Sequence, residues 1–196
     1  MCDGFAPELR LVNRPRRFSQ AISEGDGISI IPAVDGAEAA RRAELDGAEG
    51  LLVDSGRESL LAEIREAVTL PILFYWGGEH ADRLAAADAC VVEAAAWSGG
   101  LDDQFELAVR VEDEEQLEDA LERLDPELFV LAGKDDEPLE SVLDLLPDVP
   151  AGKLVIAELP ATTRADVDEL ERAGIDAVIV RAGNVAELIG EPPPEV

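Results

Sequence analysis

The chain has 196 residues, of which 47% are hydrophobic and 31% charged, so it can bury one sizeable core and needs no second domain. It carries 44 Asp and Glu against 16 Lys and Arg, a formal net charge of −28. This charge argues against nucleic acid and anionic membranes as partners, because both require a cationic protein face.

The predicted elements begin after an irregular lead-in over residues 1–17, with a short helix over residues 18–22. From Gly27 the chain repeats one pattern, in which a short apolar run, a turn and an amphipathic helical stretch follow one another. Eight parallel strands close a barrel, so we predict a single α/β domain, a (βα)8 TIM barrel, over residues 18–190, with a proline-rich tail at 191–196. The eight apolar runs are residues 28–34, 50–53, 71–75, 89–92, 107–111, 128–131, 154–157 and 177–180.

Two connections carry further predictions. The segment between the fourth and fifth strands, residues 93–106, is short and glycine-rich, so we expect the fourth helix to be lost or reduced to one turn. Thr163 and Asp166 have the spacing of a cap for the helix after the seventh strand. An open doubly wound sheet is the alternative architecture, but the first strand is followed by a single glycine, Gly36, where a dinucleotide fingerprint needs three. We therefore predict no nucleotide cofactor.

Parallel barrels place their chemistry at the carboxyl ends of the strands. As an active site, this end would use Asp35 or Glu158 as general base and Arg110, Lys134 or Arg181 to hold an anionic substrate. Asp54, Tyr75 and Glu93 would complete the substrate-binding set. The alternative is a mutually paired layer of charges that seals the barrel. The last inward residues of the eight strands are predicted to be Asp35, Asp54, Tyr75, Glu93, Arg110, Lys134, Glu158 and Arg181.

The remaining composition limits the chemistry and the compartment. His80 is the single histidine, and Cys2 and Cys90 do not form a disulfide framework, so we predict no metal, no cofactor and a cytoplasmic protein. No apolar run is long enough to span a membrane. An acidic surface with two lysines, Lys134 and Lys153, suits a high-salt cytoplasm, and an arginine-preferring genome is the alternative explanation.

Several segments of the chain have the form of framework motifs of a known barrel family. They are RFSQAI (17–22), GISII (27–31), AVTLPIL (67–73), DACVV (88–92) with AAA (94–96), VRVEDEEQL (109–117) and AGIDAVIV (173–180). In this order, from about residue 16 to residue 190, they resemble indole-3-glycerol-phosphate synthase, the (βα)8 carboxy-lyase of tryptophan biosynthesis. Framework motifs specify a fold better than a reaction.

The family's catalytic residues fall mostly on other residue types in this chain. The glutamate and lysine that end the family's first strand fall on Ala33 and Asp35, and the lysine of its third strand falls on Tyr75. The glutamate of the fifth strand falls on Arg110. The glutamate of the seventh strand is kept as Glu158.

Three further family positions also differ. The asparagine of the sixth strand falls on Ala132 or Gly133, and the phosphate-binding Ser-Gly after the seventh strand is Leu159-Pro160. The Gly-Glu-Ser of the eighth strand is Arg181-Ala182-Gly183. The family reaction needs a cationic acid beside the substrate and backbone N–H groups at its phosphate, and Pro160 has no N–H to donate. The resemblance therefore implies a divergent member that lacks the standard reaction.

Two other functions remain open. One is a catalytically retired barrel that binds a small anionic metabolite or another protein. The other is a sugar-phosphate isomerase of the histidine-biosynthesis type. The segment IIPAVD (30–35) resembles the first strand of those isomerases with its catalytic aspartate, and Gly77 and Gly78 resemble the glycines after their third strand. The second catalytic aspartate of those isomerases has no counterpart at Arg110.

Overall fold

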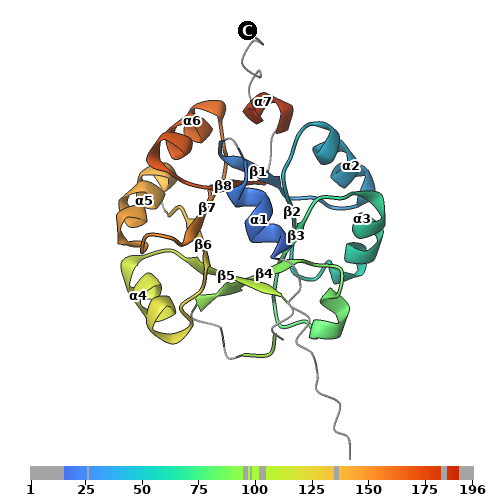
Figure 1. The fold of residues 1–196 in the computed structure, drawn as a ribbon, viewed down its shortest axis with the longest axis horizontal. Coiled ribbons are helices and arrows are strands. Elements are labelled where there is room, and N and C mark those ends of the chain that lie inside the picture. Colours follow the sequence, from blue (N-terminus) through green and yellow to red (C-terminus); the bar gives the residue numbers. More distant parts are fainter. Residues whose placement is uncertain are drawn as a thin grey trace, which may run out of the picture.

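The structure is a computed structural model that describes residues 16–25, 27–94, 97, 99–101, 105–134, 137–181 and 185–189. The predicted lead-in and the proline-rich tail lie almost wholly outside the described residues. Eight parallel strands form one sheet in the order β1-β8-β7-β6-β5-β4-β3-β2 (Figure 1). The strands are β1 (Ser29–Pro32), β2 (Leu51–Val53), β3 (Ile72–Tyr75), β4 (Ala89–Glu93), β5 (Glu106–Val111), β6 (Leu128–Ala132), β7 (Leu154–Glu158) and β8 (Ala177–Val180).

The two ends of the sheet meet between β1 and β2. Ala33 forms a parallel bridge with Leu52, and the N–H of Val34 donates to the carbonyl oxygen of Leu52 at 2.9 Å. The sheet is therefore a barrel, as predicted, and the open doubly wound alternative is wrong.

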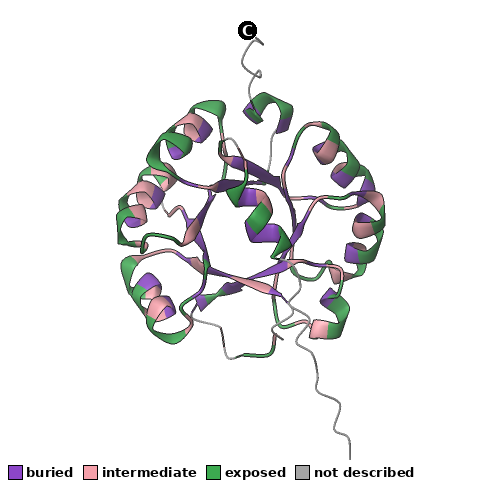
Figure 2. Ribbon diagram, in the orientation of Figure 1, coloured by how far each residue is buried: buried purple, intermediate pink, exposed green. Residues whose placement is uncertain are grey.

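Helices surround the barrel, with apolar faces turned to the strands and polar faces to solvent (Figure 2). None of the helices in the described part of the chain is long and apolar enough to cross a membrane. The α-helices are α1 (Arg17–Ser23), α2 (Ala37–Leu45), α3 (Leu61–Ala67), α4 (Glu114–Arg123), α5 (Pro138–Leu145), α6 (Arg164–Ala173) and α7 (Val185–Ile189), and the short 3-10 helices are η1 (Glu58–Leu60), η2 (Ala81–Leu84) and η4 (Leu146–Asp148).

The helix after the seventh strand starts as predicted. The Thr163 hydroxyl accepts from the N–H of Asp166, and the Asp166 carboxylate accepts from the N–H of Thr163, which completes a capping box at the start of α6.

The side of the barrel around β4 has fewer helices than a full ring. The connection from β3 to β4 contains η2 in place of an α-helix, a reduction that the sequence did not predict. Between β4 and β5, the described residues 94, 97, 99–101 and 105 form no α-helix, and residues 95, 96, 98 and 102–104 lie outside the described part.

The core has two layers, because alternate strand residues point to opposite faces of the sheet. Outward residues pack under the helices, and inward residues fill the barrel. The inner cluster includes Phe18 and Ile22 of α1, which both lie at most 2% exposed. This helix closes the amino-terminal end of the barrel, where the carboxylate of Glu106 accepts from the N–H groups of Phe18 and Ser19.

Candidate functional site at the barrel mouth

The inward alternation of the strands continues to the carboxyl end of the barrel, which we call the mouth. Each of three buried inward residues is followed, two positions later, by a polar side chain. The pairs are Leu73 and Tyr75, Ile156 and Glu158, and Ile179 and Arg181. The apolar filling of the barrel therefore ends in a layer of polar side chains.

Glu158 is the centre of this layer and is 8% exposed. Its Oε2 accepts from the Tyr75 hydroxyl at 2.6 Å and from Arg110 Nε at 2.8 Å. Its Oε1 accepts from Nε and Nη2 of Arg181 at 2.9 and 2.8 Å. Both carboxylate oxygens are thus occupied by protein donors, with two guanidinium groups and a phenol around one negative charge.

The two arginines are held by further carboxylates at the edge of the mouth. Nη1 of Arg110 donates to Glu112 Oε1 at 2.7 Å and lies 3.2 Å from Glu93 Oε2. Nη1 of Arg181 donates to Asp54 Oδ1 at 2.8 Å, and its guanidinium carbon lies 5.4 Å from the centre of the Tyr75 ring. We call the set Asp54, Tyr75, Glu93, Arg110, Glu112, Glu158 and Arg181 the ionic layer.

The ionic layer holds its groups in defined protonation states. Burial by itself raises the pKa of Glu158, but the hydrogen bonds from Tyr75, Arg110 and Arg181 hold this pKa below its usual value. Burial and the neighbouring charge of Glu158 raise the pKa of the Tyr75 phenol well above its usual value. At neutral pH the centre of the layer therefore contains the Glu158 carboxylate, the neutral Tyr75 phenol and two guanidinium ions.

Lys134 lies beside the ionic layer and has its own partners. Its Nζ donates to Asp113 Oδ2 at 2.7 Å and lies 3.7 Å from Glu112 Oε2. The hydrogen bond that Lys134 donates to Asp113 raises the pKa of the Lys134 ammonium group, so this group remains charged and paired. Asp113 also caps α4 by accepting from the N–H of Gln116 at 3.0 Å.

Asp35 is the one predicted site residue that the structure leaves apart from these groups. Its side chain is exposed and lines a surface pocket along α2 together with Glu38, Arg41 and Leu45. It forms no hydrogen bond or ion pair with another described residue. The inward position at the end of β1 belongs instead to Ala33, which packs against the inner cluster.

The asparagine of the synthase family's sixth strand falls on Ala132 or Gly133, and the structure gives a reason why Gly133 has no side chain. Ala132 is the inward residue of β6, 3% exposed and in register with Glu158. A Cβ atom on Gly133 would lie 2.5 Å from the carbonyl oxygen of Pro138, at the start of α5. The close approach of α5 to the strand therefore leaves no room for a side chain at Gly133.

Three acidic residues with defined roles were missed from the sequence. Glu112 and Asp113 follow β5 directly, two and three residues after Arg110, and the Asp-x-x-Gln spacing of a helix cap was the available signal for Asp113. The third, Glu79, follows two glycines after β3 and is bound by the loops after β2 and β3. No local pattern distinguishes it from a solvated loop carboxylate.

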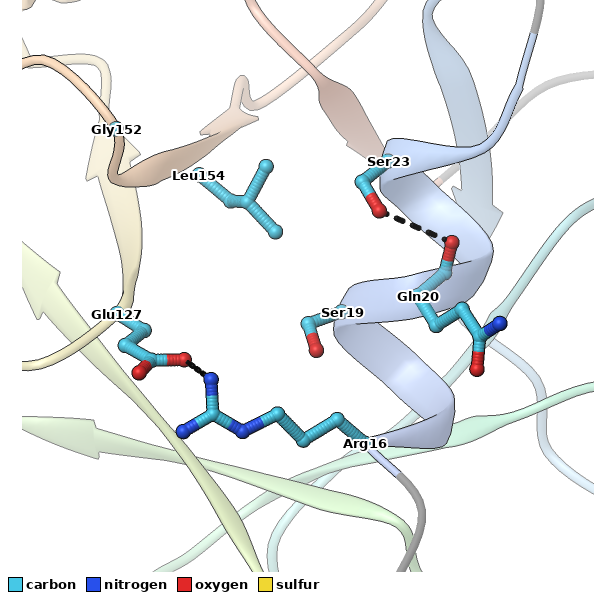
Figure 3. Close-up of a pocket in the computed structure, with 7 residues that line it drawn as sticks. All are labelled: Arg16, Ser19, Gln20, Ser23, Glu127, Gly152 and Leu154. Carbon is cyan, nitrogen blue, oxygen red and sulfur yellow. Dashed lines mark hydrogen bonds and ion pairs between the residues drawn. The ribbon is translucent and has the colours of Figure 1, made fainter.

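A second polar pocket of about 330 Å³ lies at the opposite end of the barrel, between α1 and the loops that precede β6 and β7 (Figure 3). Arg16 forms an ion pair with Glu127 across it, and Ser23 donates to the carbonyl oxygen of Gln20. The amino-terminal end of such barrels serves stability more often than chemistry. Among the residues the structure describes, no three His, Cys, Asp or Glu side chains are arranged to hold a metal ion.

Comparisons with known proteins support the barrel more strongly than a reaction. No family model matches the sequence. An indole-3-glycerol phosphate synthase from Geobacillus sp. (strain WCH70) is 28% identical over 143 aligned positions, which cover 64% of this chain and 55% of that protein. The chain thus spans about half the length of this curated relative. A phosphoenolpyruvate phosphomutase from Streptomyces platensis subsp. rosaceus matches with a TM-score of 0.64 at 15% identity, over 86% of this chain and 81% of its own, and shows the fold alone.

Proposed function

We propose that this chain is a divergent relative of the indole-3-glycerol-phosphate synthases that lacks the ring-closing decarboxylation and serves as a non-catalytic barrel for a small ligand. The observation that carries the proposal is the occupancy of Glu158, whose two oxygens accept from Tyr75, Arg110 and Arg181. Glu158 is the one synthase-like catalytic residue kept in the sequence. In this arrangement both oxygens of Glu158 already accept hydrogen bonds from side chains of the protein.

The cations of the mouth support the same conclusion. Arg110, Lys134 and Arg181 are each paired with at least one carboxylate. An anionic substrate would have to displace these carboxylates, and five of them, counting Glu112 and Asp113, surround three cations. The local field therefore repels an anion that approaches the centre of the mouth.

The groups needed for the synthase reaction are replaced together. Asp35 and Tyr75 occupy the positions of the two lysines, and Pro160 removes a phosphate-binding N–H. Electrostatic interactions of this kind are each worth about 2–4 kcal/mol in a transition state, so the loss of several leaves no measurable rate. The isomerase alternative gains no support, because Asp35 is exposed and stands apart from the ionic layer.

The test is a direct assay of the purified, folded chain with the family substrate, beside an active synthase under the same conditions. We expect no indole-3-glycerol phosphate from this chain and no rescue of a tryptophan auxotroph. Formation of the product would overturn the proposal. Arg110→Ala and Lys134→Ala, assayed separately, would then identify the substitute acid or cation.

A further inference from the structure

The loops after β2 and β3 converge on the side chain of Glu79. Oε1 of Glu79 accepts from the Ser55 hydroxyl at 2.9 Å and from the N–H of Gly56 at 3.0 Å, and Oε2 accepts from the N–H of Gly77 at 2.7 Å. We call these three donors the anion cradle. They come from two different loops and point at one carboxylate.

The backbone of both loops is shaped so that the donors can converge. Gly56 has φ +76°, and a Cβ atom on Gly77 would lie 2.1 Å from the Ser55 hydroxyl oxygen. A side chain at position 77 would therefore push the two loops apart. Convergent backbone N–H groups on glycine-rich loops are a common way to bind phosphate and carboxylate groups.

The cradle holds its anion without any ion pair. Within the described residues, no Lys, Arg or His lies within ion-pair distance of Glu79. Burial raises the pKa of Glu79, but the N–H groups of Gly56, Gly77 and Glu79 itself and the Ser55 hydroxyl lower it below its usual value. The donors are thus arranged to bind a negatively charged group. Because they are uncharged, they attract the Glu79 carboxylate through their dipoles and not through an ion pair.

The loop residues around Glu79 are exposed to solvent. Ser55, Gly56, Gly77 and Gly78 are all exposed, and Gly78 has φ +104°. The backbone of Glu79 stays anchored separately, because Trp76 Nε1 donates to its carbonyl oxygen at 2.8 Å. The carboxylate can therefore leave the cradle without disturbing β3.

We propose that the anion cradle is the site at which this barrel recognises the phosphate or carboxylate group of a small ligand, and that Glu79 is its internal occupant in the absence of that ligand. Asp54 of the ionic layer directly precedes Ser55, so a ligand held in the cradle lies at the edge of the mouth. This proposal rests on the proposed function, because it assigns a site to the small ligand named there. It concerns binding and not catalysis. An active synthase would overturn the proposed function and leave the cradle untouched.

The experiment is a titration of the ¹⁵N-labelled chain with inorganic phosphate and, separately, acetate, in molar potassium chloride to screen the net charge. The readout is the backbone amide resonances of Gly56 and Gly77. Glu79→Ala removes the internal occupant, and Asp82→Ala is the matched control, because it removes one exposed charge three residues away without touching the cradle.

We expect Glu79→Ala to bind an anion about tenfold more tightly than the unmodified chain, since a competing charge-assisted hydrogen bond is removed. Asp82→Ala should bind like the unmodified chain, and Gly77→Ala added to Glu79→Ala should abolish the gain. If Glu79→Ala fails to fold, Glu79→Gln keeps the shape of the side chain and should give a gain in the same direction. Equal affinities of Glu79→Ala and Asp82→Ala, or shifts centred on Arg110 and Arg181, would overturn the proposal.

Discussion

The hydroxyl of Tyr75, at the end of β3, lies 2.6 Å from Oε2 of Glu158, at the end of β7 on the opposite side of the barrel. This contact crosses the mouth, and Arg110 and Arg181 bind the same carboxylate from β5 and the end of β8. Four strands are therefore joined through one side chain.

Glu158→Gln should destabilise the fold by about 2–3 kcal/mol, because it leaves two partly buried guanidinium groups facing a neutral amide. A fully buried pair would lose about 3–5 kcal/mol, but the Arg181 side chain is 35% exposed and partly solvated. Urea unfolding measures the change. Glu93→Gln is the control, since the Glu93 side chain is 46% exposed and should contribute at most about 1 kcal/mol. Equal losses in the two variants would show that Glu158 has no central role.

The contribution of Glu158 should depend on pH in a defined direction. The pKa of Glu158 is lower in the folded chain than its ordinary value, so its stabilisation is complete above the unfolded pKa of about 4.3 and is lost as the pH falls through the folded pKa. The difference in unfolding free energy between the unmodified chain and Glu158→Gln should therefore shrink on acidification below about pH 4. A difference that stayed constant with pH would contradict the ion pairing.

Tyr75 is the single tyrosine of the chain, so the phenolate absorbance band reports its ionisation directly. Because burial and the charge of Glu158 raise its pKa, the folded chain should show no phenolate at the pH, about 10, where a free tyrosine ionises. The stability that Tyr75 contributes should be complete below that pH and lost as the pH rises toward the folded pKa. The same titration in urea is the control and should return the ordinary pKa. An ordinary pKa in the folded chain would mean that the phenol is solvated.

The net charge of −28 should make stability depend on salt. Raising potassium chloride from low to molar concentration screens repulsion between carboxylates, so the melting temperature should rise steeply. A neutral osmolyte at equal osmolality is the control for a general solute effect. A melting temperature that stays flat with salt would favour genomic bias as the origin of the acidic composition.

The barrel could be predicted from the amino-acid sequence, because the signal for it is local and repeated. Eight apolar runs separated by amphipathic stretches can be read one at a time, and each of them corresponds to a strand of the structure. The Thr163 and Asp166 cap could be predicted from the sequence for the same reason, since both partners lie within one helical turn. The sequence did not predict that the segment after β3 forms only the short helix η2, because packing around the barrel decides whether such a segment completes an α-helix.

Which of the polar strand ends contact one another depends on how the strands are arranged around the barrel. Strand alternation named Tyr75, Arg110, Glu158 and Arg181 as inward residues, but their common contact depends on distances across the barrel that no local pattern contains. The same alternation predicted Asp35 as an inward residue, and this was wrong, because β1 ends at Pro32 and Asp35 is exposed. Glu79 shows the limit most clearly, since its donors come from loops more than twenty residues apart and meet only when β2 and β3 are paired.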